Sequence, residues 1–335
     1  MSFPPGHPPV ATGKIGVLIV NLGTPDAPDA GAVRRYLGEF LSDRRVVEIP
    51  PLLWQPILHG IILRTRPKKS AHAYNLVWRE DGSPLAAITA LQARALHGAF
   101  GPDVIVNFAM RYGRPAIAER LAALKAQGCE RILVAPLYPQ YCAATTATAN
   151  DAAFAALAAM RWQPALRTLP PYHDDPTYIG ALRESVEAGL AALDFTPDLI
   201  IASFHGMPQR TLELGDPYHC HCRKTGRLLS EALGRELLVT FQSRFGRAKW
   251  LEPATDVTLE KLARQGTRKV AILAPGFSAD CLETLEELAI RGRESFVAAG
   301  GTDFAYLPCL NDSEGGVKML RSILSRELEG WVRPL

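Results

Sequence analysis

The chain alternates short apolar runs with longer stretches of helical spacing, and this alternation limits the fold more than any other feature. The first run is Lys14 to Asn21, and two more follow at Val104 to Met110 and at Arg131 to Leu137. Each run contains β-branched residues and is followed within three residues by Gly or Pro, which is typical of a buried strand that ends in a turn. Because helical spacing follows each run, the strands are expected to be parallel and joined by helices.

The same alternation resumes after a proline-rich stretch, 164–176, which we interpret as a connection between two lobes. The strands expected in the second half are Leu199–Phe204, Leu237–Ser243, Lys269–Leu273 and Phe304–Leu307. The sequence therefore predicts an α/β protein with two Rossmann-like lobes, each a doubly wound, mainly parallel sheet flanked by helices. We assign 1–165 to the first lobe and 166–312 to the second, and expect the last helix, 313–335, to pack back on the first.

Composition excludes several classes of protein. The net charge is +3 and no block of five like charges occurs, so neither nucleic acid nor an acidic partner is indicated. No apolar run reaches the length of about 18 residues that spans a membrane, and residues 1–5 lack the features of a signal peptide. Six cysteines in 335 residues do not make a disulfide framework, so we expect a cytoplasmic protein with reduced thiols.

The stretch Ile200 to Thr225 contains the first candidate site. Its apolar run ends abruptly at His205, which is followed by Gly206 and Pro208. Ligands of open α/β sheets bind at the carboxyl ends of the strands, and a histidine there can exchange a proton near neutral pH. For this residue alone, a solvated histidine or one paired with a carbonyl is an equally good interpretation.

A second candidate site begins where another strand ends, at Pro275 to Glu287. It holds four carboxylates in eight residues, namely Asp280, Glu283, Glu286 and Glu287. Asp280 and Glu283 have the spacing of a helix capping box, which is the structural alternative. Positions 280, 283 and 287 also share one helical face, which could bind a divalent cation or carry protons away from a substrate. If His205 lies opposite this face, the histidine would supply a base and the carboxylates an acidic conduit. Inserting a metal into nitrogen ligands requires both.

Aromatic and cationic residues follow several expected strands. They are Arg111, Tyr112, Tyr138 and Tyr141 in the first half and Trp250, with Leu251, in the second. Together they would suit a large, flat, anionic aromatic ligand, although each alone is more typical of an ordinary core or rim.

Residues 50–63 form an apolar segment that contains Trp54 and Ile62 and is closed by a basic cluster, Arg64 to Lys69. Such a segment suits a membrane interface or the mouth of an apolar pocket, and a buried connector is the alternative.

The run His219-Cys220-His221-Cys222 offers soft ligands in what we expect to be a tight loop. Its C-x-C spacing is not that of a zinc site. With Cys142 at another strand end, thiolates from separate loops could hold an iron–sulfur cluster, and unrelated free thiols are the alternative.

Several segments, in this order, resemble the ferrochelatase family from about Gly16 to Asn311: VNLGTPDAP, FAMRYG, LYPQY, SFHGMP with GDPY, QSRFG with KWLEPATD, and GFSADCLETLEE. The resemblance implies two Rossmann-like lobes around a porphyrin cleft. It also implies that Fe²⁺ replaces two pyrrole protons of protoporphyrin IX to give protohaem, the final step of haem biosynthesis. Iron is then a substrate, and the chemistry requires no resident cofactor.

The resemblance also assigns roles. It places the active-site histidine on His205 and the essential carboxylate on Glu283, both contacting the incoming iron, with Asp280 and Glu287 as a candidate conduit. The substrate-binding residues that the resemblance implies are Arg111, Tyr112, Tyr138, Tyr141 and Trp250. Their placement in the sequence adds Leu251, Trp54 and Ile62 to the candidates. The candidate ligands of a [2Fe–2S] cluster are Cys142, Cys220 and Cys222, with the fourth undetermined. Cys281 stands where animal members carry a second histidine.

Two alternatives remain open. A chelatase for another tetrapyrrole, such as coproporphyrin III, or one that inserts cobalt, would favour a more basic and less apolar mouth than 50–63. A non-catalytic two-lobed protein that binds a metal or tetrapyrrole would not need His205 opposite a carboxylate row. Peripheral association with the inner membrane face is expected from the apolar segment, and both a monomer and a homodimer are compatible with the sequence.

Overall fold

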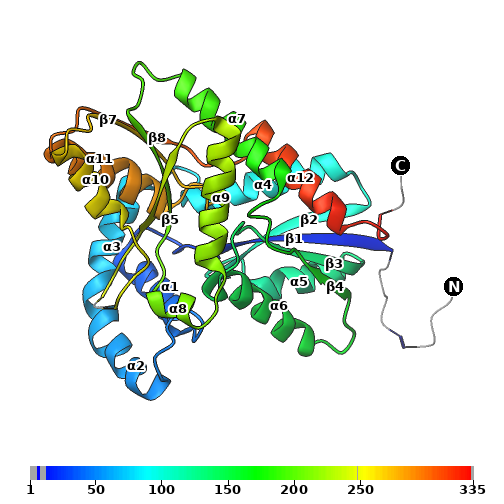
Figure 1. The fold of residues 1–335 in the computed structure, drawn as a ribbon. Helices are drawn as coiled ribbons and strands as arrows, with labels where there is room; N and C mark the ends of the chain where they lie inside the picture. The colour runs from blue at the N-terminus through cyan, green and yellow to red at the C-terminus, as the bar shows by residue number, and fades with distance from the viewer. Residues whose placement is uncertain (1–5, 8–12, 247, 333–335) are drawn as a thin grey trace.

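Two parallel sheets form the framework of the chain (Figure 1). The computed structural model describes residues 6–7, 13–246 and 248–332, and these contain two four-stranded sheets; the proline-rich start, 1–5, lies outside them. The first sheet has the order β2-β1-β3-β4, with β1 (Lys14–Gly23), β2 (Val104–Tyr112), β3 (Cys129–Pro136) and β4 (Ala165–Thr168). The second has the order β6-β5-β7-β8, with β5 (Leu199–His205), β6 (Leu237–Gln242), β7 (Lys269–Leu273) and β8 (Asp303–Leu307).

The two sheets share one topology, because in each the first strand along the chain lies second in the sheet. This arrangement confirms the predicted pair of parallel α/β lobes. In the first sheet Val17 lies beside both Val106 and Leu133. Neighbouring β1 residues Val17 and Leu18 are both fully buried on opposite faces, which explains why the strand is continuously apolar rather than alternating.

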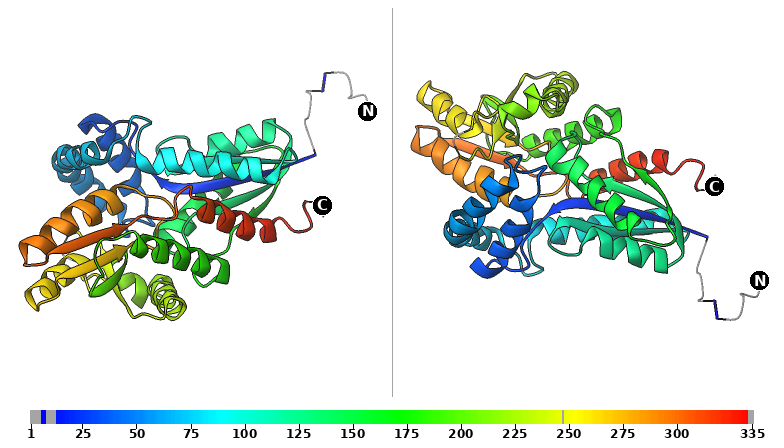
Figure 2. Two further views of the ribbon diagram at one scale, coloured as in Figure 1. Left: turned by 90° about the horizontal axis from the view of Figure 1, so that it is seen from above. Right: turned by 90° about the horizontal axis from the view of Figure 1, so that it is seen from below.

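Helices cover both faces of each sheet (Figure 2). In the first lobe α4 (Pro84–Phe100) packs on one face, and α5 (Ile117–Ala126) and α6 (Thr148–Ala158) pack on the other. In the second lobe α7 (Pro176–Ala191) and α9 (Tyr218–Leu233) cover one face, while α10 (Thr255–Arg264), η3 (Glu283–Gly292) and α11 (Arg293–Ala298) cover the other. The last helix, α12 (Glu314–Glu327), packs against both α4 and α7, and one apolar core runs through both lobes.

The apolar segment forms a helical projection. Helix α1 (Ala30–Ser42) packs on α3 (Leu63–Val77), and α2 (Pro51–Ile57) and the π-helical turn η1 (Leu58–Ile62) lie between them in sequence. In Figure 1 these blue helices extend from the first lobe beneath the second, and α3 packs against η3. Within the described ranges, every helix is too short or too polar to cross a membrane.

Two expectations about local structure are wrong. The stretch 164–176 is not simply a connection, because β4 lies within it and pairs with β3. Helix α9 begins at Tyr218, so His219 to Cys222 are helical rather than in a loop. The carboxylate of Asp216 accepts a hydrogen bond from the Tyr218 N–H at 3.0 Å, which stabilises this earlier helix start.

Candidate active site

His205 is the last residue of β5 and lies at the C-terminal edge of the second sheet. The side chain is half-buried, and its Nδ1 lies 2.6 Å from the Gly206 carbonyl oxygen. A carbonyl oxygen can only accept, so Nδ1 carries the proton of the neutral ring and Nε2 is the proton acceptor. The Tyr218 hydroxyl donates to the His205 carbonyl at 2.9 Å, which ties the strand end to α9.

Gly206 allows Trp250 to approach this strand end. A Cβ on Gly206 would lie 2.5 Å from the Gln242 oxygen and 3.3 Å from Cε3 of Trp250. The Trp250 indole donates to the Phe245 carbonyl at 2.9 Å, and its ring packs against that of Phe245. Trp250 also lines a pocket of about 400 Å³, a size within the range of small-molecule sites.

We expect Gly206→Ala to displace Trp250 and to lower the stability of the protein by about 1–3 kcal/mol, since no space exists for the methyl group. The effect would appear as a lower denaturation midpoint and as weaker binding of the porphyrin that the family resemblance implies. Gly180→Ala is the matched control, because Gly180 lies within α7 with nothing near its Cβ position, and this change should be neutral or stabilising. Unchanged stability and binding in Gly206→Ala would contradict this packing account.

Asp280 is held in a buried hydrogen-bond network. Its Oδ1 accepts from Thr284 Oγ1 at 2.9 Å and from the Tyr306 hydroxyl at 2.6 Å, and its Oδ2 accepts from Asn311 Nδ2 at 2.6 Å. Glu283 begins η3, and the capping box that was the structural alternative for Asp280 and Glu283 does not form. Asp280 therefore fixes the start of η3 through its bond to Thr284, and both of its carboxylate oxygens are bonded within this network.

Glu287 lies near enough to His205 for the two charges to interact. Ser243 donates to both carboxylate oxygens of Glu287, through its N–H at 2.7 Å and through its Oγ at 2.6 Å. Burial raises the pKa of Glu287, whereas the Ser243 hydrogen bonds and the positive form of His205 lower it. A base at the end of β5 thus lies near a half-buried carboxylate of η3, which is bonded to the residue that follows β6.

Glu283 lies on the same segment but faces the first lobe. Burial raises the pKa values of Tyr36 and Tyr74, and the negative charge of Glu283 raises both further. The Glu283 carbonyl accepts from Gln242 Nε2 at 2.8 Å, and Gln242 is the residue that pairs with His205 in the sheet. The structure therefore brings His205, Glu283 and Glu287 together at one interlobe edge.

Asp43 holds together the residues at the end of β2 in the first lobe. Its Oδ2 accepts hydrogen bonds from Arg111 at 2.6 Å, from the Tyr112 hydroxyl at 2.9 Å and from Thr148 at 2.5 Å. Tyr112 is fully buried against Phe40, so the expectation that its ring forms a substrate-facing wall is wrong. Arg111 is half-buried and also donates to the Thr148 carbonyl at 2.9 Å.

The loop after β3 is fastened to the second lobe. The Tyr141 N–H donates to His221 Nδ1 at 3.2 Å, and Gln140 Nε2 donates to Thr225 Oγ1 at 3.0 Å. Tyr138 and Tyr141 are both half-buried, and burial raises the pKa of each hydroxyl. The Tyr138 hydroxyl is buried without a hydrogen-bond partner, so it could bond to a bound ligand.

The apolar projection presents different residues from those expected. Trp54 is buried, and its indole donates to the Leu41 carbonyl at 2.6 Å, so Trp54 stabilises the projection from inside. Ile62 is half-buried against the apolar cluster that Trp54 forms with Leu41, Leu58 and Leu63. Leu251 of the second lobe is also buried. The exposed apolar side chains are Leu52, Leu53, Ile57 and Ile61, and the first of these is 92% exposed.

The basic residues after this projection point in two directions. Arg64, Lys68 and Lys69 are exposed. Arg66 is half-buried and its guanidinium lies 4.8 Å from the Phe245 ring centre, which links α3 to the loop that carries Trp250.

Two of the predicted cluster ligands, Cys220 and Cys222, do not converge on one point. They are two residues apart on α9 and point in roughly opposite directions, since one is exposed and the other is fully buried. Cys142 and Cys222 are both buried and lie near each other, and burial raises the pKa of Cys142 to about 12 and that of Cys222 well above its usual value. In the described part of the chain, no three His, Cys, Asp or Glu side chains are grouped to hold a metal.

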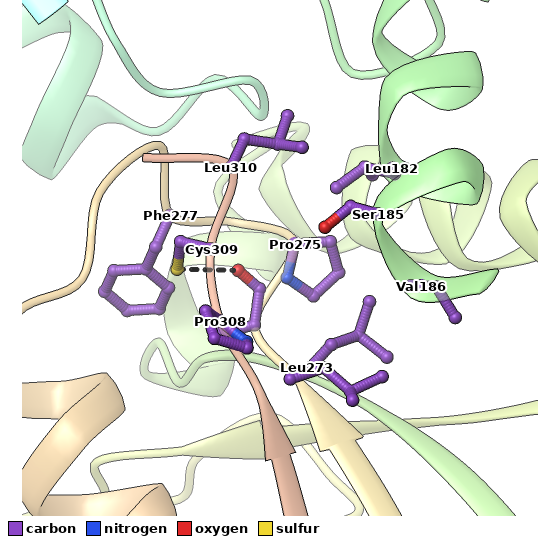
Figure 3. A pocket seen from close by; sticks show the side chains of 11 residues that line it. Leu182, Ser185, Val186, Leu273, Pro275, Phe277, Pro308, Cys309 and Leu310 are labelled. Atoms are coloured by element: carbon purple, nitrogen blue, oxygen red, sulfur yellow. Dashed lines mark hydrogen bonds between the residues drawn. The ribbon is translucent and has the colours of Figure 1, made fainter. Parts of the chain in front are cut away.

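A separate crevice lies between α7 and the ends of β7 and β8 (Figure 3). Its volume is about 10 Å³, roughly the space for one water, and it is lined mainly by apolar side chains and Cys309. Its size excludes an organic ligand.

Several residues of this edge were missed by sequence reasoning. They are Tyr36, Asp43, Tyr74, Gln242 and Ser243. Gln242 and Ser243 lie in the QSRFG segment that contributed to the family resemblance. The other three lie in helices or just after them, where nothing local distinguishes a site residue from a structural one.

Solved structures show the class to which this fold belongs. SirB from Bacillus subtilis with Fe³⁺ has a TM-score of 0.57 at 12% identity, with 95% of this chain and 97% of that chain covered. The sirohydrochlorin chelatase SirB from Bacillus subtilis subspecies spizizenii in complex with cobalt has a TM-score of 0.54 at 10% identity, with 94% and 97% covered. The chain therefore has the two-lobed α/β fold of these chelatases.

Sequence comparison defines the family. The ferrochelatase family model matches residues 14–328. The ferrochelatase of Rhizobium meliloti (strain 1021) is 58% identical over 333 residues, covering 97% of this chain and 98% of that protein. That of Methylocella silvestris (strain BL2) is 52% identical over 338 residues, covering 97% of each. The chain belongs to the ferrochelatase family, an enzyme family of metal chelatases, and the resemblance carried by the ordered motifs is confirmed.

Proposed function

We propose that this chain inserts Fe²⁺ into protoporphyrin IX and releases protohaem, in a reaction that requires no cofactor for its chemistry. The observation that carries the proposal is the position of His205 at a strand end, paired through Gln242 with the segment that holds Glu283 and Glu287, in a chain of the ferrochelatase family. One nitrogen base beside two carboxylates suits a reaction that removes two protons from pyrrole nitrogens as the metal enters.

The protein must also expose the pyrrole lone pairs. In a planar macrocycle these lone pairs lie in the ring plane and point to the ring centre, where an iron that approaches from one face cannot reach them. Binding therefore has to bend the porphyrin before iron can coordinate. Nε2 of His205 then accepts a pyrrole proton. Glu283 and Glu287 pass protons away or guide iron, and Trp250 and Tyr138 contact the macrocycle.

The nearest alternative of another class is a protein that binds a tetrapyrrole without chemistry. Incubation with Zn²⁺ and a soluble porphyrin, followed by fluorescence, distinguishes the two, because insertion changes the emission spectrum whereas binding leaves a metal-free porphyrin. Comparison of protoporphyrin IX with coproporphyrin III at saturating Fe²⁺ tests the other alternative. Faster turnover of protoporphyrin IX is expected, since Leu52, Leu53 and Ile61 make the projection apolar.

We also propose that the projection rests on a membrane surface and admits the apolar porphyrin from it. Leu52, Leu53 and Ile61 are exposed beside Arg64 and Lys68, which is the composition expected of a segment lying at an anionic bilayer surface. The expected effect of replacing the three apolar residues with Ser is a loss of about tenfold or more in binding to anionic lipid vesicles, measured by pelleting.

The matched control places Ser at Phe154 and Val297, which are exposed apolar residues on other helices. This control should pellet with vesicles as well as the unchanged protein does. Equal pelleting of the Leu52, Leu53 and Ile61 variant would show that the projection does not carry membrane binding, while leaving the proposed iron insertion untouched.

A further inference from the structure

Ser243 has an unusual backbone conformation at the end of β6. Its φ is +62°, and within the described residues it shares a positive φ with just one other non-glycine, Asn311. L-residues with a Cβ are disfavoured in this left-handed region, and Asn is the side chain that tolerates it better than Ser does. Such conformations concentrate at functional sites, where surrounding contacts hold them in place.

The left-handed turn directs two donors at one carboxylate. The Ser243 N–H reaches Oε1 of Glu287 at 2.7 Å, and its hydroxyl reaches Oε2 at 2.6 Å. Both carboxylate oxygens are therefore held by a single residue. A carboxylate bonded at both oxygens cannot rotate about its last bond without losing both hydrogen bonds.

Gln242 anchors this turn on both sides. Its Nε2 donates to the Glu283 carbonyl at 2.8 Å, and its own carbonyl accepts from the Gly206 N–H at 2.7 Å. The Ser203 hydroxyl donates to Gln242 Oε1 at 2.8 Å. The pair Gln242–Ser243 thus connects the strand that ends in His205 with the first turn of η3.

Glu287 has a competing partner. Nη2 of Arg291 lies 4.0 Å from Glu287 Oε2, one turn along the same segment, while the Nε of Arg291 pairs with Glu286 at 2.8 Å. Without Ser243, the Glu287 carboxylate could turn towards this guanidinium and away from His205.

We infer that Ser243 is a positioning residue for iron insertion, which holds the Glu287 carboxylate on the His205 side and limits its pairing with Arg291 to the 4.0 Å contact. The inference rests on the proposed function and deepens it. Ser243 itself contacts neither the porphyrin nor the iron in this account, and it acts through Glu287 alone.

A double-mutant cycle tests the inference in the full-length protein with Fe²⁺ and protoporphyrin IX. Ser243→Ala keeps the N–H and the strained backbone but removes the hydroxyl. It should lower kcat about tenfold and change KM for porphyrin less than about twofold. In the Glu287→Gln background, the same Ser243→Ala change should alter kcat less than about twofold, because the carboxylate that Ser243 positions has already been replaced by an amide.

Two further variants separate positioning from folding. Ser243→Gly adopts a positive φ without strain and should lower kcat as much as Ser243→Ala while unfolding at the same temperature as the unchanged protein or higher. Ser230→Ala removes a hydroxyl bond to the Arg235 carbonyl far from the site and should leave kcat unchanged.

Four results would overturn the inference: an unchanged kcat in Ser243→Ala, unchanged activity of Glu287→Gln, an equal loss in both Glu287 backgrounds, or failure of Ser243→Gly to fold. The last two would assign Ser243 to the fold rather than to Glu287. None of these outcomes affects the role of His205, so failure of this inference and failure of the proposed function remain distinguishable.

Discussion

Replacing His205 with Ala is expected to lower kcat of iron insertion by about 10²–10⁴-fold, the usual contribution of a positioned general base. The ring bonds to the adjacent Gly206 carbonyl rather than to another element, so the fold should persist. Porphyrin binding should remain detectable, because Trp250 and the loop that carries Tyr138 do not depend on the imidazole. Steady-state haem formation under anaerobic conditions gives the rate, and quenching of porphyrin fluorescence gives the binding.

The control for His205 is His72→Ala, which removes an exposed histidine of α3. Its turnover should match that of the unchanged protein. A His205→Ala protein that keeps most of its turnover would show that another group accepts the pyrrole protons.

Neutralising Glu283 is the second change with a large expected effect. Glu283→Gln keeps the size of the side chain and the backbone carbonyl that accepts from Gln242, but removes the charge that faces Tyr36 and Tyr74. We expect kcat to fall by about 10–10²-fold at saturating Fe²⁺, with porphyrin affinity within about twofold of its original value.

Glu294→Gln serves as the control for charge, because Glu294 is exposed on the neighbouring helix α11. It should not alter turnover. If raising the Fe²⁺ concentration restores the full rate of Glu283→Gln, the residue delivers iron without taking part in proton transfer. An unchanged rate at all iron concentrations would remove Glu283 from the site.

The inner strands β1, β3, β5 and β7 were predictable because each is buried on both faces and therefore reads as a continuous apolar run. Strand β7 has the predicted bounds, and β5 ends one residue later than expected, at His205 itself. Strand β4 was missed, since four residues at a sheet edge pair with β3 alone and carry no local pattern. The start of α9 was missed because histidines and cysteines favour a helix weakly, and burial of Cys222 and Thr225 outweighs this local preference.

The site was predictable where chemistry coincides with a strand end, as at His205 and the segment that begins with Glu283. Roles that depend on distant partners were not. Asp43 bonds to Thr148, 105 residues away, and nothing near Asp43 in the sequence indicates this. Trp54 was instead predicted to be a site residue and is structural. A tryptophan in an apolar segment suggests an interfacial position, whereas its hydrogen bond to the Leu41 carbonyl holds it inside the projection.

The most direct test of the account is anaerobic incubation of the purified protein with Fe²⁺ and protoporphyrin IX, with the absorbance of the product followed in time. The account predicts catalytic formation of protohaem, many turnovers per protein, with two protons released for each iron inserted. Binding of porphyrin with no haem formed beyond the rate without protein would contradict it.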